Sequence, residues 1–255
     1  MATNSPVHLP LSLIVPCYER PTQTRQLLRS LDRSTSRCEI ILVDDASPQP
    51  LSSIASEYPN LNIKYIRNAS KRGPAHSRNV GISHCQYNFV AFTDNDCIAD
   101  EAWLAHLYKA IAESPPQMAG IGGRVAAARK DLFSQYYDYH KILDPWYFRG
   151  KYYYLTTANS IFKRHAVDLV GGFDATLLIA GGEDPGLCFK LQNIGYSFGY
   201  SPYALIYHDY RPSLAAFMRT FYRYGYGCAA QSTKHFRPQG FVQDKSFGAL
   251  EGHGN

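Results

Sequence analysis

The sequence predicts an α/β protein with a mostly parallel central sheet flanked by helices. Three observations support this prediction. In the first half of the chain, short apolar runs of strand length alternate with segments whose apolar residues recur at helical spacing. These runs are continuously apolar, which is typical of strands that are buried on both faces of a sheet. With 255 residues, of which 45% are hydrophobic, the chain is long enough to bury such a core in one domain.

Four strands and four helices are expected to alternate in this first half. The strands are expected over residues 11–15, 39–43, 62–66 and 89–92. The helices are expected over residues 22–34, 51–58, 73–83 and 103–111. We expect Pro16 to end the first strand and Thr22 to cap the first helix.

The second half is less regular. Its expected strands cover residues 117–127, 155–162 and 203–207, the last ending at His208. A loop that enters a helix is expected over 181–193, and an amphipathic helix over 212–231. Between them, residues 134–154 are unusually rich in Tyr. These rings are either ordinary packing residues or a platform on which a sugar ring or a lipid-linked acceptor stacks.

Charge and cysteine content narrow the function classes. There are 26 basic and 21 acidic side chains, a net charge of +5. This mild excess suits an anionic ligand such as a nucleotide but is too small to indicate nucleic-acid binding. The six cysteines form no CxxC pair or zinc-site spacing, and no signal peptide or membrane-spanning run is apparent. We therefore expect a reduced, cytoplasmic protein, with peripheral membrane contact left open.

The loops that follow the predicted strands carry the polar residues of interest. In parallel α/β sheets, ligands bind outside the carboxyl ends of the strands. Asp94 and Asp96 follow one such strand, and their two-residue spacing on extended backbone points both carboxylates the same way. Such a pair can bind Mg²⁺ or Mn²⁺. The alternative is a solvated turn, in which Asp and Asn are common.

Four other positions have both a functional and a structural interpretation. Asp45 could accept a hydrogen bond from a base or a ribose, or simply form a turn. Arg78 lies near an expected helix start that suits a diphosphate, or faces solvent. Asp184 could be a general base, or an acidic residue that stabilises the start of a helix. His208 gains interest only if the chain returns beside Asp96.

Taken in order, these motifs resemble the family 2 inverting glycosyltransferases of GT-A fold. The resemblance covers about residues 9–230 and includes Val15-Pro-Cys-Tyr-Glu-Arg20, Val43-Asp-Asp-Ala-Ser47, Gly73-Pro-Ala-His-Ser-Arg-Asn79, Phe92-Thr-Asp-Asn-Asp96, Gly182-Glu-Asp184 and His208. One departure is Cys97, where many relatives carry a third acidic residue.

The resemblance implies roles for individual residues. Asp184 would be the catalytic base, and Asp96 and His208 would bind Mn²⁺ or Mg²⁺. Glu183 and Trp146 are expected to contact the acceptor. The residues expected to bind the nucleotide sugar are Pro16, Tyr18, Glu19, Asp45, Arg78, Asp94, Asn95 and Asn159. Among these, Tyr18 would stack on the base, Asp45 would bind its edge and Arg78 would lie near the diphosphate.

The implied activity is metal-dependent transfer of a sugar, with inversion, from a nucleotide-diphosphate donor to an acceptor hydroxyl. A UDP-sugar is the first donor to consider, and the acceptor would be a saccharide or glycoconjugate, as in polysaccharide synthesis. One domain is expected over residues 1–235, with a nucleotide-binding half over 9–115, an acceptor half over 116–235 and a flexible tail over 236–255.

Two alternatives stay open, a non-catalytic nucleotide-sugar-binding module and a sugar nucleotidyltransferase. A nucleotidyltransferase would carry a glycine-rich loop after the first strand, but residues 16–20 contain no glycine. A nicotinamide dehydrogenase is excluded because the GxGxxG motif is absent there.

Overall fold

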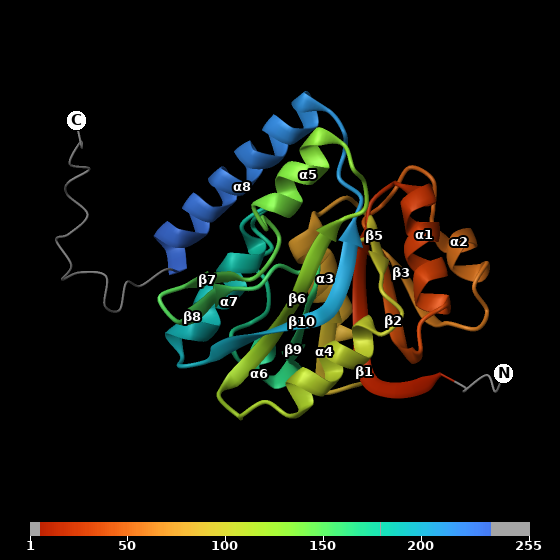
Figure 1. Ribbon diagram of the computed structural model, residues 1–255. Helices are drawn as coiled ribbons and strands as arrows, with labels where there is room; N and C mark the ends of the chain where they lie inside the picture. The colour runs from red at the N-terminus through yellow and green to blue at the C-terminus, as the bar shows by residue number, and fades with distance from the viewer. Residues whose placement is uncertain (1–5, 179, 236–255) are drawn as a thin grey trace.

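An eight-stranded sheet forms the centre of the protein (Figure 1). The computed structural model describes residues 6–178 and 180–235, so the predicted tail over 236–255 lies outside the described residues. The strands of the sheet are β1 (Val7–Cys17), β2 (Ser36–Asp44), β3 (Asn62–Arg67), β4 (Phe89–Phe92), β5 (Cys97–Ala99), β6 (Met118–Ala127), β9 (Ser160–Lys163) and β10 (Ser197–His208). Their order in the sheet is β3-β2-β1-β4-β9-β6-β10-β5.

The sheet is mostly parallel, as predicted. Strand β1 pairs in parallel with β2 and β4, β2 with β3, and β6 with β10. Strand β9 runs antiparallel to both of its neighbours, β4 and β6, and β5 runs antiparallel to β10. The sheet thus consists of two parallel groups that are joined by the short antiparallel strand β9, with β5 as an antiparallel strand at one edge.

Helices cover both faces of the sheet, which explains why its strands are continuously apolar. One face packs against α1 (Pro21–Asp32), α2 (Ser52–Ser56) and α4 (Trp103–Ala112). The other face packs against α3 (Pro74–Ser83), α6 (Arg164–Leu169) and α7 (Glu183–Asn193). In β1, Leu13 and Val15 point to the first face and Ile14 to the second, and all three are fully buried.

Two expected boundaries at the first strand and helix are wrong. Strand β1 continues through Pro16 to Cys17, because its neighbour β4 ends opposite Ile14 and leaves that side of β1 unpaired. Helix α1 begins at Pro21 with Arg20 as its N-cap, so Thr22 is not the cap. Proline is favoured at the first helical position, where its missing N–H costs no hydrogen bond.

The second half also departs from the expected elements. Of the expected strand over 155–162, only residues 160–162 are extended, as part of β9. The chain before them turns, with Thr156 Oγ1 donating to the Leu143 carbonyl oxygen and Thr157 N–H donating to Asp184 at the start of α7. The aromatic segment forms α5 (Leu132–Tyr139) and a hairpin of β7 (Trp146–Phe148) and β8 (Lys151–Tyr154). Strand β5 and helix α6 were not expected.

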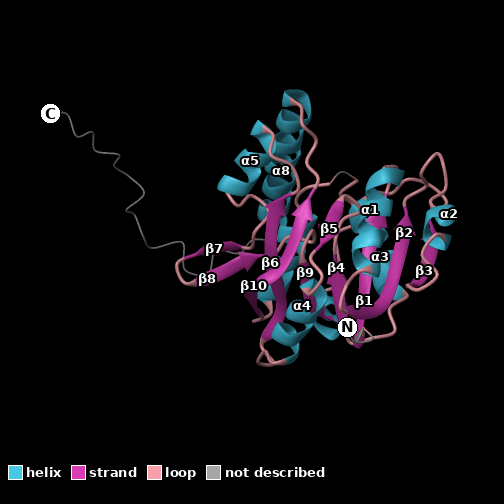
Figure 2. Cartoon of the chain, turned by 45° about the vertical axis from the view of Figure 1, so that its right-hand side comes forward, coloured by secondary structure: helices cyan, strands magenta, loops and turns pink. Residues whose placement is uncertain are grey.

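The last helix, α8 (Leu214–His235), lies beside α5 across the carboxyl ends of β6 and β10 (Figures 1 and 2). Aromatic side chains join the two helices, including Phe133 and Phe217 with ring centres 5.3 Å apart. Together they form a wall above one end of the sheet. Within the described residues, no helix combines the length and apolar character needed to cross a bilayer.

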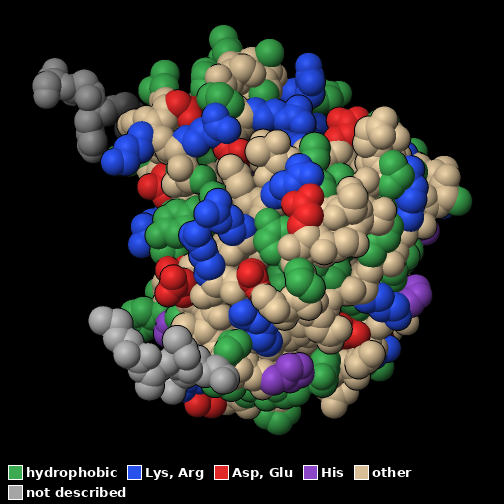
Figure 3. Space-filling view, turned by 90° about the vertical axis from the view of Figure 1, so that its right-hand side faces the viewer, with side chains coloured by type: hydrophobic (Ala, Val, Ile, Leu, Met, Phe, Trp, Pro, Cys, Tyr) green, Lys and Arg blue, Asp and Glu red, His purple; other side chains and the backbone are tan. Residues whose placement is uncertain are grey.

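The face that bears α1 and α2 shows positive and negative side chains interspersed (Figure 3). Arg25 of α1 and Glu57 form one such exposed pair, with an N–O distance of 2.8 Å. The expectation that nucleic acid is not a partner stays a prediction.

Candidate active site

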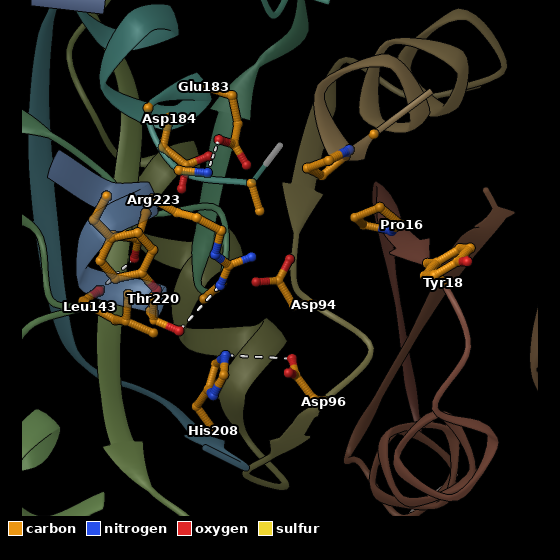
Figure 4. A pocket seen from close by; sticks show the side chains of 18 of the residues that line it. Pro16, Tyr18, Asp94, Asp96, Leu143, Glu183, Asp184, His208, Thr220 and Arg223 are labelled. Carbon is orange, nitrogen blue, oxygen red and sulfur yellow. Dashed lines mark hydrogen bonds and ion pairs between the residues drawn. The ribbon is translucent and has the colours of Figure 1, made fainter. Parts of the chain in front are cut away.

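A cavity of about 700 Å³ opens at the carboxyl edge of the sheet, below α5 and α8. It collects residues that are far apart in the sequence (Figure 4). The predicted site residues that line it are Pro16, Tyr18, Asp45, Arg78, Asp94, Asn95, Asp96, Glu183, Asp184 and His208. Glu19, Asn159 and Trp146 are not among its lining residues. The pocket therefore brings together Asp45, Asp96, Asp184 and His208, which we expected to gather around one site.

Arg78 connects the carboxylates of this pocket. Its buried guanidinium lies 2.8 Å from Asp94 Oδ1, 3.0 Å from Glu183 Oε1 and 3.8 Å from Asp184 Oδ1. Burial disfavours the charged guanidinium, but Asp94, Asp184 and Glu183 outweigh it and raise the pKa of Arg78. Arg78 is thus committed to three protein carboxylates and ties the start of α7 to the loop after β4.

Asp184 is held by Thr157. Thr157 N–H donates to Oδ2 at 3.0 Å and the Thr157 hydroxyl donates to Oδ1 at 2.8 Å. The side chain is 19% exposed. Burial raises the pKa of Asp184 to about 7, Arg78 opposes this increase and Glu183 adds to it. A carboxyl group with such a pKa, at the wall of a pocket, is suited to accept a proton near neutral pH.

Glycines set the position of Asp184. Gly181 and Gly182 have φ of 115° and 104°, which L side chains rarely adopt, and they turn the chain into α7. Gly227 of α8 packs directly on this turn, and a Cβ atom there would lie 1.6 Å from the Gly181 carbonyl oxygen. Glu183 also holds the turn, because Gly181 N–H donates to its Oε2 at 2.6 Å. Both Glu183 oxygens thus have protein partners, and its contact with an acceptor stays a prediction.

Asp96 and His208 meet because β5 pairs with β10, which places His208 opposite Cys97. His208 Nε2 lies 3.4 Å from Asp96 Oδ1. The ligand atoms of Asp96, Cys97 and His208 all lie within 4.8 Å of one another. Burial raises the pKa of the Cys97 thiol well above its usual value. Sulfur ligands also suit softer cations than Mg²⁺ or Mn²⁺.

The remaining pair fits a divalent cation. A carboxylate and an imidazole suit Mn²⁺ and, less well, Mg²⁺, and two protein ligands leave positions for phosphate oxygens and water. Within the described residues, the buried Nδ1 of His208 has no hydrogen-bond partner. Its ring is oriented by stacking on Tyr210, with ring centres 4.4 Å apart.

The opposite wall of the pocket carries Tyr18 and Asp45. The Lys71 ammonium lies 3.5 Å from the centre of the Tyr18 ring. Asp45 Oδ1 accepts hydrogen bonds from Asn68 Nδ2 at 2.8 Å and Arg72 N–H at 2.9 Å. Asp45 Oδ2 accepts one from Gly73 N–H at 2.8 Å and so can accept another from a ligand.

The sequence model for Glycosyl transferase family 2 matches residues 12–171. The chain belongs to this family. Two curated family relatives are similar over most of the chain. The pre-mycofactocin glycosyltransferase of Mycobacterium tuberculosis (strain H37Rv) is 28% identical over 240 residues, which are 91% of this chain and 49% of that protein. Polypeptide N-acetylgalactosaminyltransferase 11 of Xenopus tropicalis is 27% identical over 81% of this chain and 39% of its own length. The chain thus spans about half the length of the curated relatives that it matches, or less.

Solved structures of glycosyltransferases share the GT-A fold of this family member. The mannosyltransferase PcManGT from Pyrobaculum calidifontis, in complex with GDP-Man and Mn²⁺, has a TM-score of 0.68 at 20% identity, over 91% of this chain and 64% of that one. The S. aureus TarS fragment 1–349, in complex with UDP-GlcNAc, has a TM-score of 0.64 at 18% identity, over 90% of this chain and 68% of that one.

Two residues that the family resemblance suggested for the pocket lie elsewhere. Asn159 is fully buried: its Oδ1 accepts from Trp103 Nε1 at 2.7 Å, and its Nδ2 donates to the carbonyl oxygens of residues 124 and 204. Its hydrogen-bonding groups are therefore all used within the protein. Trp146 lies on the β7–β8 hairpin, is 41% exposed and packs near Tyr154, a pocket-lining residue whose ring centre is 5.6 Å away.

Two more predicted site residues, Glu19 and Asn95, lie in loops that are hydrogen-bonded to each other. Asn95 Nδ2 donates to the Glu19 carbonyl oxygen at 3.2 Å and to Thr24 Oγ1 at 3.0 Å. Glu19 itself is exposed. Asn95 thus joins the loops after β4 and β1, and its direct contact with a nucleotide sugar is not tested.

Several residues that line the pocket of this family member were not predicted from the sequence. Arg211, Arg219 and Arg223 line the pocket from α8 and the loop before it. The Arg223 side chain extends toward Asp94 (Figure 4), and its Nη2 donates to Thr220 Oγ1 at 3.2 Å. The basic residues within the amphipathic segment 212–231 were the available signal. Thr157 gave no sequence signal of its own.

Proposed function

We propose that the chain catalyses metal-dependent, inverting transfer of a sugar from a nucleotide-diphosphate donor to an acceptor hydroxyl. The observation that carries this proposal is that Asp184 lies in the same large pocket as Asp96 and His208, a pair whose ligand atoms are close enough to hold a divalent cation. Membership of glycosyl transferase family 2 supports the reaction class. A UDP-sugar is the first donor to test, and GDP-Man is the donor in the PcManGT complex.

Asp184 is proposed as the general base. It would accept the proton of the acceptor hydroxyl as that oxygen attacks the anomeric carbon from the face opposite the diphosphate. One displacement inverts the centre, so no enzyme nucleophile is needed. Thr157 and Arg78 fix the carboxylate, so little of the reaction barrier is spent on orienting it.

Asp96 and His208 would hold Mn²⁺ or Mg²⁺. The cation, when bound, neutralises the donor diphosphate and makes it a better leaving group. The nucleotide would lie on the wall formed by Pro16, Tyr18 and Asp45, with Tyr18 stacked on the base.

The acceptor is proposed to be a saccharide or glycoconjugate that enters beside α5 and α8. This side of the pocket is partly apolar and aromatic, with Ile142, Leu143, Tyr154 and Phe217 among the lining residues. Such a surface suits stacking on a sugar ring. We propose polysaccharide or glycoconjugate synthesis as the setting, with Glu183 and Trp146 as acceptor contacts to test.

A non-catalytic binding module would need no base beside the cation site. The shared pocket of Asp96 and Asp184 therefore favours an enzyme over such a module. Family membership favours a glycosyltransferase over a sugar nucleotidyltransferase.

The test is hydrolysis of UDP-, GDP- and dTDP-sugars with and without Mn²⁺, followed by transfer to candidate saccharides. We expect cation-dependent turnover that Asp184→Asn removes, with an inverted anomeric product by NMR. Donor binding without any turnover would favour the binding module.

A further inference from the structure

Asp96 already has a positive partner within the protein. The Arg20 guanidinium forms an ion pair and a hydrogen bond with Asp96 Oδ2, while Asp96 Oδ1 lies 3.4 Å from His208 Nε2. The Arg20 and Asp96 side chains are only 22% and 13% exposed. The carboxylate expected to bind a cation is thus neutralised by an arginine that lines the same pocket.

The backbone that carries Arg20 is strained. Glu19 and Arg20 both have φ of 57°, a left-handed conformation that residues other than glycine rarely adopt. Surrounding groups impose it: Glu19 N–H donates to Ser47 Oγ at 2.8 Å, and Thr24 N–H donates to the Arg20 carbonyl oxygen at 3.0 Å. Asn95, from the loop that carries Asp96, donates to the Glu19 carbonyl oxygen. The fold therefore maintains an unfavourable turn that places Arg20 beside Asp96.

Positive charge is crowded around this carboxylate. Arg20 is the main cause of a lowered pKa of Arg211, and burial adds to it. A divalent cation on Asp96 and His208 would bring two more positive charges to the same place. Like charges at short range in a partly desolvated pocket repel strongly, so Arg20 and the cation cannot share Asp96 without cost.

We propose that Arg20 and the divalent cation compete for Asp96. Arg20 neutralises the carboxylate when no cation is bound, and cation binding releases its guanidinium toward the diphosphate of the donor. This inference rests on the proposed function, because it takes Asp96 as a cation ligand. It makes Arg20 a positioning residue in the cation-free enzyme and a diphosphate contact in the donor complex.

Manganese affinity without nucleotide tests the competition. We expect Arg20→Gln to bind Mn²⁺ about tenfold more tightly than the wild type in an EPR titration, because one charge-assisted contact no longer competes. Arg25→Gln is the matched control: it removes the same charge from α1, the helix that Arg20 precedes, but its partner is Glu57, and we expect unchanged affinity. Unchanged or weaker Mn²⁺ binding by Arg20→Gln would overturn the proposal.

Two further variants separate charge from folding. Arg20→Lys keeps the charge and should bind Mn²⁺ less tightly than Arg20→Gln; equal affinities of these two variants would contradict competition by charge. Arg20→Gly removes the side chain and relieves the left-handed backbone, so it should fold at least as well as the wild type and also bind Mn²⁺ more tightly.

Calorimetry with UDP and GDP at saturating Mn²⁺ tests the release of Arg20 toward the diphosphate. We expect Arg20→Gln to bind the nucleoside diphosphate about tenfold more weakly than the wild type, with unchanged affinity for the matching nucleoside. Equal diphosphate affinity would overturn this part of the proposal. A wild type that binds neither UDP nor GDP with Mn²⁺ would count against the proposed function instead.

Discussion

Replacing Asp184 by Asn should change stability in a pH-dependent way. The pKa of Asp184 rises from its ordinary 3.8 to about 7 in the folded protein. The native state therefore binds a proton more tightly than the unfolded state, and the stability from this proton is lost as the pH rises toward 7 and above. An amide resembles the protonated carboxyl and does not titrate.

The expected magnitude follows from the size of the shift. At 1.36 kcal/mol per pKa unit, the full shift corresponds to about 4 kcal/mol, of which about 2–3 kcal/mol is lost between pH 5 and pH 8. The amide can keep both contacts with Thr157, because the Thr157 hydroxyl can turn to accept from the amide nitrogen. The free energy of unfolding of the variant minus that of the wild type should therefore be about 2–3 kcal/mol larger at pH 8 than at pH 5.

Urea unfolding of both proteins at the two pH values measures this difference. Asp131→Asn is the control: hydrogen bonding within its helix cap lowers the pKa of Asp131, so it is ionised throughout the window and its effect should not change with pH. A stability difference for Asp184→Asn that is equal at pH 5 and pH 8 would refute our account of this carboxyl group. The same variant should lose transfer and keep its affinity for the nucleoside diphosphate with Mn²⁺.

Three other predictions concern the parts that hold the site together. Arg78→Gln leaves three neighbouring carboxylates without their shared cation and should lower the free energy of unfolding by about 3–5 kcal/mol in urea; a loss below about 1 kcal/mol would contradict its structural role. Gly227→Ala should abolish transfer and lower the free energy of unfolding by about 1–3 kcal/mol, because its Cβ would meet the Gly181 carbonyl oxygen. The control, Gly225→Ala, has open space around it and should raise the free energy of unfolding by up to about 1 kcal/mol. Similar effects of the two variants would argue against the contact between Gly227 and Gly181. His208→Ala should weaken Mn²⁺ binding at least tenfold in an EPR titration. His84→Ala, at an exposed histidine, is the control. If His208→Ala kept its Mn²⁺ affinity, His208 would not be a cation ligand.

Much of the fold was predictable because strands that are buried on both faces of the sheet appear in the sequence as continuous apolar runs. The apolar runs around Ile14 and Ile41 located two central strands, although Pro16 obscured where the first one ends. The three-residue β5 is too short to show any period. Its pairing with β10 is tertiary, so the approach of His208 to Asp96 was a conditional expectation that only the structure could satisfy.

Site residues were predictable where a motif fixed their place at the end of a strand. The orientation of a side chain was harder to predict, because a motif specifies the position of a residue along the chain and not the partners of its side chain. Asn159 lies in a suggested segment, yet its amide points into the core. Arg78 lies in the pocket as expected, but its partners are three carboxylates from two places in the chain, the loop after β4 and the start of α7.

Strand β9 has a consequence for how the enzyme can diversify. This four-residue strand divides a module of β1 to β4, whose loops present Tyr18 and Asp45, from a module in which the pairing of β5 with β10 holds Asp96 beside His208. Changes on one side of this strand can alter one specificity while the other is preserved. A nucleotide on the wall of Tyr18 and Asp45 and a cation held by Asp96 and His208 would thus depend on different sides of β9.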